Sequence, residues 1–222
     1  MPSATVENVS GCCARHGQEE LFQERFARRL ARRYRRRGPD AMARSLARRA
    51  SASGIEGAEV LEIGGGIGQV LLELLKAGAS RGEVVELVPV YEEHARALAV
   101  EAGVGERVSY RTADLIADPP ARTSADVVVL NKVVCCTPDG VELAALAASL
   151  ARRTLALSFP RDVIWSRAFF GATNVVLRLT RRRFRVFVHP PDALAAAVES
   201  QGLALSSERD GPLFRIAAYE RA

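Results

Sequence analysis

A glycine-dense loop in the stretch VLEIGGGIGQV most constrains what this chain can fold into. Four of the five residues from position 64 to 68 are glycine, an apolar strand precedes them, and a helical stretch follows. A strand, a loop and a helix in this order are typical of α/β sheets, whose ligands bind beyond the carboxyl ends of the strands. Glycine has no Cβ, so a ligand can approach the bare backbone, and the next helix presents free N–H groups. The loop predicts a nucleotide-like ligand, with a tight packing turn as the alternative.

Apolar strands alternate with helical stretches from residue 59 onward. The expected strands are 59–63, 83–87, 107–111, 125–130 and 154–159, and the expected helices are 68–77, 90–102 and 139–151. This alternation predicts a parallel sheet covered by helices on both faces. After residue 160 we expect a helix at 163–180, an extended segment RRRFRVFVHPP, a helix at 191–201, and strands near 203–208 and 213–219. The predicted fold is a Rossmann-like, doubly wound, mostly parallel seven-stranded α/β sheet.

The N-terminal part is predicted to form a helical extension. A helix is expected at 18–37, where apolar residues recur every four positions: Phe22, Phe26, Leu30 and Tyr34. Gly38-Pro39 ends it, and a shorter helix is expected at about 40–50. We therefore divide the chain into a helical cap at 1–57 and a main domain at 58–222, with an insertion after the fifth strand at about 160–190.

Composition excludes several classes of protein. Hydrophobic residues make up 48% of the 222 residues, enough for a folded core. No apolar run reaches the roughly eighteen residues of a membrane span, because Lys132 interrupts the longest one. The N-terminus does not resemble a signal peptide, so a cytoplasmic location with reduced cysteines is expected. Twelve arginines within 15–49, in a chain of net charge +5, keep contact with nucleic acid or a membrane surface open.

The spacing of the glycines distinguishes between the known types of glycine-rich ligand-binding loop. The dinucleotide fingerprint G-x-G-x-x-G/A fails in both registers, since Gln69 or Leu71 stands at its last position. The G-K-[ST] of a phosphate loop is also absent. What remains is the pattern E-x-G-x-G-x-G, formed by Glu62, Gly64, Gly66 and Gly68. This pattern resembles motif I of the class I S-adenosylmethionine-dependent methyltransferases, and the resemblance spans about 59–160.

The resemblance implies S-adenosylmethionine as cofactor and assigns it residues beyond the loop. Glu86, at the end of the second strand, would accept hydrogen bonds from both ribose hydroxyls. Asp114 would take the adenine amino group, and the N–H of Leu115 would meet the ring. Asn131 would lie near the methionine part, and Glu62 would help to hold its amino end. The expected cofactor site is Glu62, Gly64, Gly65, Gly66, Gly68, Glu86, Leu87, Asp114, Leu115 and Asn131.

Three of these acids also have a purely structural interpretation. Glu86 is alternatively a solvated residue at a strand end. Asp114 is alternatively a capping residue in a loop. Glu62 is alternatively an inward-facing carboxylate that loop amides satisfy.

Histidines are the candidate bases. Methyl transfer depends mainly on alignment of the acceptor with the sulfonium methyl, and a base is needed only where the acceptor arrives protonated. His189, in the rigid stretch FVHPP, is the predicted catalytic residue, and His16 ranks below it. A structural role is the alternative for a lone histidine.

The four cysteines form two adjacent pairs, Cys12-Cys13 and Cys135-Cys136. By the resemblance, the second pair lies where the transferred methyl sits. A soft-metal or redox site is one interpretation, and small residues that pack a loop are the other. The C-x-x-C spacing of zinc modules is missing, so we expect no metal. Cys135 and Cys136 are predicted to line the acceptor pocket.

The segment after the fifth strand is predicted to form the acceptor pocket. The resemblance implies a substrate-binding insertion here, and the segment is rich in aromatic residues. One helical face carries Trp165, Phe169, Ala172, Val176 and Leu179. The alternative is an ordinary amphipathic helix packed on the sheet. The predicted substrate-binding residues are Tyr34, Cys135, Cys136, Trp165 and Phe169.

The expected function is methyl transfer to a small, partly hydrophobic metabolite, with oxygen as the favoured acceptor atom and N-, S- and C-methylation left open. The layout also loosely resembles that of the magnesium-protoporphyrin O-methyltransferases. This resemblance implies a planar or lipophilic acceptor with a carboxylate or hydroxyl group, and the arginines at 181–183 would contact an anionic group on it. One alternative is an RNA- or DNA-modifying methyltransferase, although the sequence from Asn131 to Val134 lacks the prolines and aromatic residue of base-amino methylases. Another is a non-catalytic protein that binds a cofactor or a membrane surface. The sequence leaves the oligomeric state open, a homodimer included.

Overall fold

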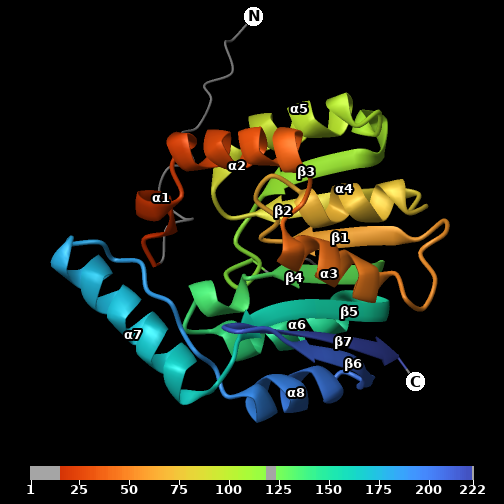
Figure 1. Ribbon diagram of the computed structural model, residues 1–222. Coiled ribbons are helices and arrows are strands. Elements are labelled where there is room, and N and C mark those ends of the chain that lie inside the picture. The colour runs from red at the N-terminus through yellow and green to blue at the C-terminus, as the bar shows by residue number, and fades with distance from the viewer. Residues whose placement is uncertain (1–15, 119–123, 222) are drawn as a thin grey trace, which may run out of the picture.

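The computed structural model describes residues 16–118 and 124–221, and a seven-stranded sheet forms its centre (Figure 1). The strand order is β3-β2-β1-β4-β5-β7-β6. The strands are β1 (Glu59–Ile63), β2 (Arg81–Glu86), β3 (Val108–Thr112), β4 (Ala125–Asn131), β5 (Ala151–Pro160), β6 (Leu203–Asp210) and β7 (Phe214–Arg221). The first five run parallel, and β7 pairs antiparallel with both β5 and β6. The predicted Rossmann-like, mostly parallel sheet is confirmed.

Helices cover both faces of the sheet, as the alternating pattern predicts. The helices are α1 (Gln18–Leu21), α2 (Glu24–Arg37), α3 (Ala41–Ala50), α4 (Gln69–Lys76), α5 (Glu92–Glu101), α6 (Gly140–Leu150), α7 (Ile164–Leu179) and α8 (Pro191–Glu199). One hydrophobic core contains residues of α2, α3, α4 and α5 together with one face of the sheet. A second core contains residues of α6 and α8 together with the other face.

Strand β4 shows why the sheet is buried on both sides. Val127 and Val129 belong to the first core, and Val128 and Leu130 belong to the second. All four side chains have no exposed surface. A continuous apolar run is what a central strand of a parallel sheet requires. Truncation of Leu130 to alanine would cost about 2–5 kcal/mol of stability.

The helix predicted at 18–37 is two helices, α1 and α2, because the chain turns at Phe22 and Gln23. The turn packs the Phe22 ring against the rings of Phe26, Tyr91 and Phe184 at centroid distances of 5.7, 6.5 and 5.4 Å. Contact with distant aromatic residues therefore outweighs continuation of the helix. The helix predicted at 90–102 begins as a 3₁₀ turn (Pro89–Tyr91) that leads into α5.

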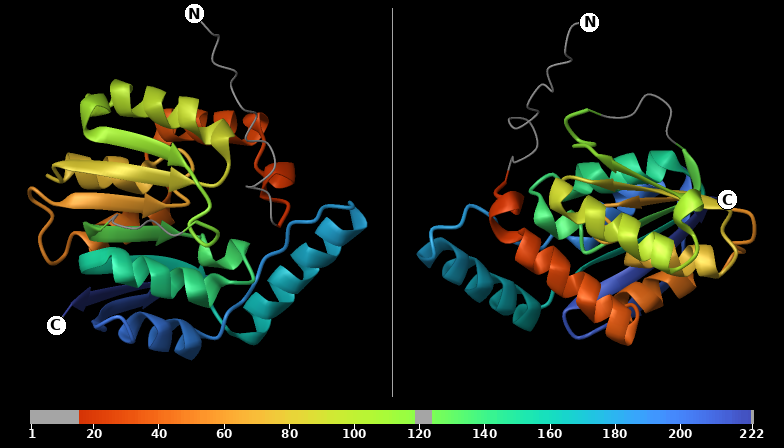
Figure 2. Two further views of the ribbon diagram at one scale, coloured as in Figure 1. Left: turned by 180° about the vertical axis from the view of Figure 1, so that it is seen from behind. Right: turned by 90° about the horizontal axis from the view of Figure 1, so that it is seen from above.

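The N-terminal helices and the segment after β5 differ in how they contact the body. Helices α2 and α3 share the first core with β1 and α4. Helix α7 stands away from the sheet, and the chain returns beside it to α8 (Figure 2). The division into a cap at 1–57 and a domain at 58–222 stays a prediction. Among the described helices, none has the length and apolar character needed to cross a membrane.

Candidate cofactor and acceptor site

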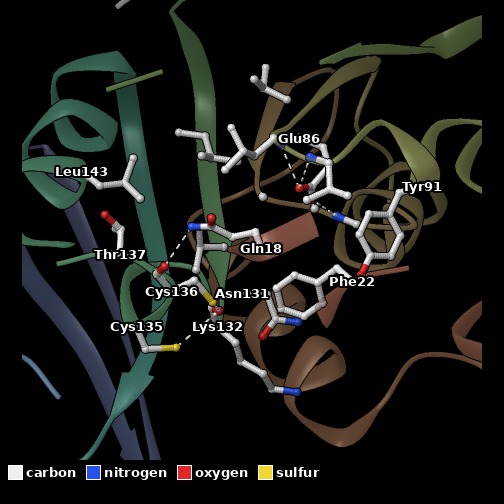
Figure 3. A pocket seen from close by; sticks show the side chains of 18 of the residues that line it. Gln18, Phe22, Glu86, Tyr91, Asn131, Lys132, Cys135, Cys136, Thr137 and Leu143 are labelled. Carbon is white, nitrogen blue, oxygen red and sulfur yellow. Dashed lines mark hydrogen bonds between the residues drawn. The ribbon is translucent and has the colours of Figure 1, made fainter. Parts of the chain in front are cut away.

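A cavity of about 410 Å³ lies at the carboxyl ends of β1, β2 and β4 (Figure 3). The glycine loop after β1 and the acidic end of β2 form one wall. Aromatic residues from five separate segments form much of the remainder: Phe22, Phe26, Tyr91, Phe170, Phe184 and Phe214. The volume falls within the range of small-molecule sites, and an apolar lining with few polar groups is typical of such sites.

Glycines are sterically required in the loop at 64–68. Gly64 and Gly66 have φ angles of +63° and +55°, which side-chain-bearing residues rarely adopt. A Cβ on Gly64 would lie 2.7 Å from the side chain of Val133, and one on Gly65 would lie 2.8 Å from the side chain of Glu62. Part of the glycine requirement is therefore packing behind the loop. Gly64, Gly65 and Gly66 also line the cavity, so the bare backbone faces it.

The carboxylate of Glu86 is held at the cavity wall by backbone amides. Its Oε2 accepts a hydrogen bond from the N–H of Gly66 at 2.8 Å, and its Oε1 accepts from Leu87 and Val88 at 2.8 and 3.1 Å. Burial raises the pKa of this carboxyl group, and the three amides oppose the shift. Because a carboxylate oxygen has two lone pairs, Oε2 can accept one further donor from a ligand.

Glu62 lies behind the glycine loop and is not part of the cavity lining. Its Oε2 accepts a hydrogen bond from the N–H of Leu71 at 2.8 Å, while Oε1 is buried without a partner among the described residues. Burial raises the pKa of Glu62 to about 8, with a smaller contribution from the charge of Glu86. Direct contact with the amino end of a ligand does not follow from this position. Gly68 also lies outside the lining, whereas the other eight predicted cofactor residues line the cavity.

Asp114 and Leu115 reach the cavity from the loop after β3. The Oδ1 of Asp114 accepts hydrogen bonds from the N–H groups of Ile116 and Ala117, both at 3.1 Å. The residue therefore acts as a local cap and lines the cavity at the same time. The two interpretations of Asp114 made from the sequence are compatible.

The end of β4 brings Asn131 and Lys132 to the cavity. The Oδ1 of Asn131 accepts from Ser158 Oγ at 3.1 Å, which fixes the amide orientation. Lys132 has φ +63°, an uncommon value for a residue with a side chain. Its Nζ lies 3.2 Å from Oδ2 of Asp40, the residue that caps α3. Burial raises the pKa of Asp40, but the Ala43 amide and the Lys132 charge outweigh it, so the pKa lies below its usual value.

The adjacent thiols of Cys135 and Cys136 both line the cavity. Each Sγ lies near the carbonyl oxygen of Lys132, at 3.4 and 3.3 Å. The neighbouring Cys135 thiol, burial and the charge of Glu86 raise the pKa of Cys136. Both thiols thus lie at the cavity wall, and Cys136 is kept neutral. Within the described ranges, no group of three or more His, Cys, Asp or Glu residues is placed to hold a metal ion. Cys12-Cys13 lies outside the described residues.

Three predicted substrate-binding residues do not line the cavity: Tyr34, Trp165 and Phe169. Tyr34 is the last residue of the apolar stripe whose earlier members line the cavity, and it lies outside the lining. It donates its O–H to Glu73 Oε1 at 3.0 Å. Trp165 donates its indole N–H to the carbonyl of Pro212 at 3.1 Å and is largely exposed. Phe169 points outward, because the next residue, Phe170, occupies the inward face of α7. The placement of these three residues in the pocket was wrong.

The predicted base His189 does not reach the cavity either. It is buried, and its Nε2 lies 3.0 and 3.1 Å from the carbonyl oxygens of Val134 and Thr137. Carbonyl oxygens only accept hydrogen bonds, so this nitrogen carries a hydrogen and cannot take a proton from a substrate. His189 thus fastens the loop after β4 to the segment before α8. His16 does line the cavity, with Nε2 3.9 Å from Oδ2 of Asp139.

The sequence interpretation missed several lining residues. Gln18 donates from Nε2 to the carbonyl of Cys136 at 3.1 Å, and this bond ties the N-terminal segment to the loop after β4. Phe184 belongs to the extended segment RRRFRVFVHPP, whose aromatic content was the available signal. Lys132 appears in the sequence only as a charge that interrupts an apolar run. Its left-handed backbone gave no signal in the sequence.

The profile of a methyltransferase domain family matches residues 31–208. The chain therefore belongs to this family, and its fold is that of the S-adenosylmethionine-dependent methyltransferases. The cavity fits that cofactor, because a Cβ-free backbone and a carboxylate with spare acceptor capacity share one wall. The comparison with curated proteins gave no match.

Solved structures agree in fold. An O-methyltransferase family protein from Burkholderia thailandensis has a TM-score of 0.70 and 19% identity over 94% of this chain and 62% of that one. This chain thus spans less than two thirds of the Burkholderia protein. Magnesium protoporphyrin IX methyltransferase from Synechocystis, with bound SAH, has a TM-score of 0.68 and 18% identity over 91% of this chain and 99% of that one. A TehB-like methyltransferase from Corynebacterium glutamicum has a TM-score of 0.61 and 18% identity, with coverage of 90% and 100%.

Proposed function

We propose that this protein transfers the methyl group of S-adenosylmethionine to an oxygen atom of a small, partly hydrophobic acceptor. The observation that carries the proposal is the composition of the cavity, which combines a wall of glycine backbone and carboxylate with an aromatic wall made of the six side chains named above. The glycine and carboxylate suit a nucleoside, and the aromatic side chains suit an apolar molecular body. Both ligands would then share one cavity, as direct transfer between them requires.

On the cofactor side of the cavity, each predicted residue would have a role. Glu86 Oε2 would accept one ribose hydroxyl, and the backbone of Gly64 to Gly66, with Leu87 beside it, would pack against the nucleoside and the methionine part. Asp114 and the N–H of Leu115 would contact the adenine. Asn131 would lie beside the methionine part, while Glu62 and Gly68 would hold the shape of the loop from behind.

His16 replaces His189 as the proposed base. It lines the cavity, and the nearby carboxylate of Asp139 would orient its ring. S-adenosylmethionine, when bound, supplies an already activated methyl group. The chain has to align the acceptor and, for a hydroxyl acceptor, remove its proton to a free nitrogen of His16. A carboxylate acceptor would need no base, and His16 would then only position it.

The aromatic wall supports an acceptor with a planar or lipophilic body. Phe22, Phe170, Phe184 and Phe214 approach from the N-terminal cap, α7, the return segment and β7. Magnesium protoporphyrin IX methyltransferase, whose fold is similar along 99% of its length, carries in its name an acceptor of this kind. We also retain the expectations of a cytoplasmic location and of a small-molecule rather than a nucleic-acid partner.

Turnover with a panel of acceptors tests the proposal. The purified protein would be incubated with S-adenosylmethionine and aromatic hydroxyl or carboxylate compounds, with amines and thiols as comparison acceptors. We expect release of S-adenosylhomocysteine with oxygen acceptors and a loss of turnover in His16→Ala only for hydroxyl acceptors. Methylation confined to amines or thiols would refute O-methylation. A gel shift at low salt, with methylation of RNA or DNA, would favour the nucleic-acid alternative.

A further inference from the structure

Helix α7 carries an apolar surface on its outer side. Of the large hydrophobic residues that are exposed in the described chain, six lie on this helix, with 51–85% of their surface accessible: Ile164, Trp165, Phe169, Val175, Val176 and Leu179. At 100° per residue these six, together with Ala168 and Ala172, fall within one arc of about 140° that holds no charged residue. A monomeric protein rarely exposes a contiguous patch of this kind without a binding partner.

The opposite side of α7 is the one that contacts the protein. Ser166 and Phe170 are its buried residues, and Phe170 packs edge-on against Phe214 at a centroid distance of 5.6 Å. Asn174 bonds with both the carbonyl and the N–H of Val186 in the return segment, each at 2.8 Å. The helix is thus fixed with its apolar arc outward, and Figures 1 and 2 show it standing clear of the sheet.

The same segment of the chain is rich in positive charge. From Val163 to Pro191 the sequence has six arginines and no acidic residue. Arg167 pairs with Asp162, and Arg183 pairs with Glu20. The other four form no ion pair with any carboxylate of the described residues: Arg178, Arg181, Arg182 and Arg185. Arg182 and Arg185 do donate hydrogen bonds to backbone carbonyl oxygens, but these neutral groups leave their charges uncompensated. An apolar helix face with aromatic residues, in a segment with arginines that have no carboxylate partner, is typical of helices that lie in the interface of an anionic bilayer.

We propose that α7 and its return segment dock the protein onto a membrane surface that contains anionic lipid. The apolar arc enters the boundary between headgroups and acyl chains, and the four unpaired arginines meet lipid phosphates. The helix lies on the membrane and does not cross it. Since Phe170, Phe184 and Val186 of this segment line the cavity, docking brings one cavity wall to the bilayer. The inference rests on the surface of α7 and holds for any acceptor.

The only tryptophan of the chain, Trp165, makes the proposal directly measurable. Vesicles of phosphatidylcholine with phosphatidylglycerol would be mixed with the protein, and vesicles of phosphatidylcholine alone would serve as the comparison. We expect a blue shift of the tryptophan emission and co-sedimentation with the anionic vesicles, both reduced at least tenfold by 0.5 M salt. The absence of co-sedimentation with anionic vesicles would overturn the proposal.

Matched variants separate α7 from general surface effects. Phe169→Glu and Val176→Glu should each weaken vesicle binding at least tenfold, and Arg181→Gln with Arg182→Gln should weaken it severalfold. Val100→Glu, at a 71% exposed position of α5, should bind as the unchanged protein does. Circular dichroism would verify that each variant is folded. Equal binding by Phe169→Glu and Val100→Glu would refute the assignment. A second result would also refute the assignment: a dimer in lipid-free solution that dissociates on Phe169→Glu, while the unchanged protein remains a dimer when vesicles are added. The apolar arc would then be a contact between two copies.

Discussion

Replacement of Glu86 by glutamine removes one specific acceptor from the cavity wall. The carboxylate accepts from the backbone N–H groups of Gly66, Leu87 and Val88. A glutamine side chain has one carbonyl oxygen and one NH₂ group, so it can serve the last two donors but not Gly66. A buried donor left without a partner costs about 1–3 kcal/mol. We expect the unfolding free energy to fall by this amount and the melting temperature to fall by roughly 2–12 °C.

The same change should weaken cofactor binding. A hydrogen bond from a ribose hydroxyl to a carboxylate contributes about 1.5–3 kcal/mol, which corresponds to about a 10- to 150-fold change in Kd. Calorimetric titration with S-adenosylhomocysteine, below the melting temperature of the variant, measures this directly. Glu83→Gln is the matched control, since Glu83 lies on the same strand and pairs with Arg111 away from the cavity. Unchanged affinity in a folded Glu86→Gln protein would refute the assignment of the ribose to this carboxylate.

Three further changes test the loop and the base. The pKa of Glu62 lies near 8 in the folded protein, above its usual 4.5, so between these pH values the folded state holds a proton that the unfolded state has lost. The unfolding free energy should therefore fall as pH rises from about 5 to 8. Glu62→Gln should flatten that decline in thermal melts recorded at several pH values. Gly64→Ala should lower the unfolding free energy by about 2–4 kcal/mol through backbone strain and overpacking. Gly57→Ala, at a similar φ of +69° but in open space, should lower it by only about 1–2 kcal/mol. Equal losses of unfolding free energy in chemical denaturation would refute the close packing of the loop. His16→Ala should lower kcat about 10²- to 10⁴-fold for a hydroxyl acceptor with little change in cofactor affinity, whereas His189→Ala should mainly lower the melting temperature, and the reverse outcome would restore His189 as the base.

The sheet and the glycine loop could be predicted from the sequence because both depend on local pattern. The apolar run of β4 requires burial on two faces, and strand β1 has the predicted bounds of Glu59–Ile63. The glycine loop is recognisable because its backbone conformation excludes other residues. Glu86 and Asp114 follow from the resemblance to the class I methyltransferases, and the parallel topology brings the strand ends near them to one edge.

The acceptor side could not be predicted in the same way, because distant contacts decide it. Helical periodicity places Trp165 and Phe169 on a common face but does not say whether that face turns inward. Phe170, one residue away, contacts Phe214 from the far end of the chain and so sets the orientation of α7. His189 likewise looks catalytic in sequence, and only the position of the carbonyls of Val134 and Thr137 shows that its Nε2 is a donor.

The central claim is that one cavity, between the glycine loop and the aromatic wall, holds the methyl donor beside its acceptor. A crystal structure of the protein with S-adenosylhomocysteine tests this most directly. The account predicts that the ribose lies against Glu86 and that the sulfur faces the part of the cavity lined by Cys135, Cys136 and His16. A nucleoside bound elsewhere, or a sulfur that faces solvent with the aromatic wall out of reach, would contradict it.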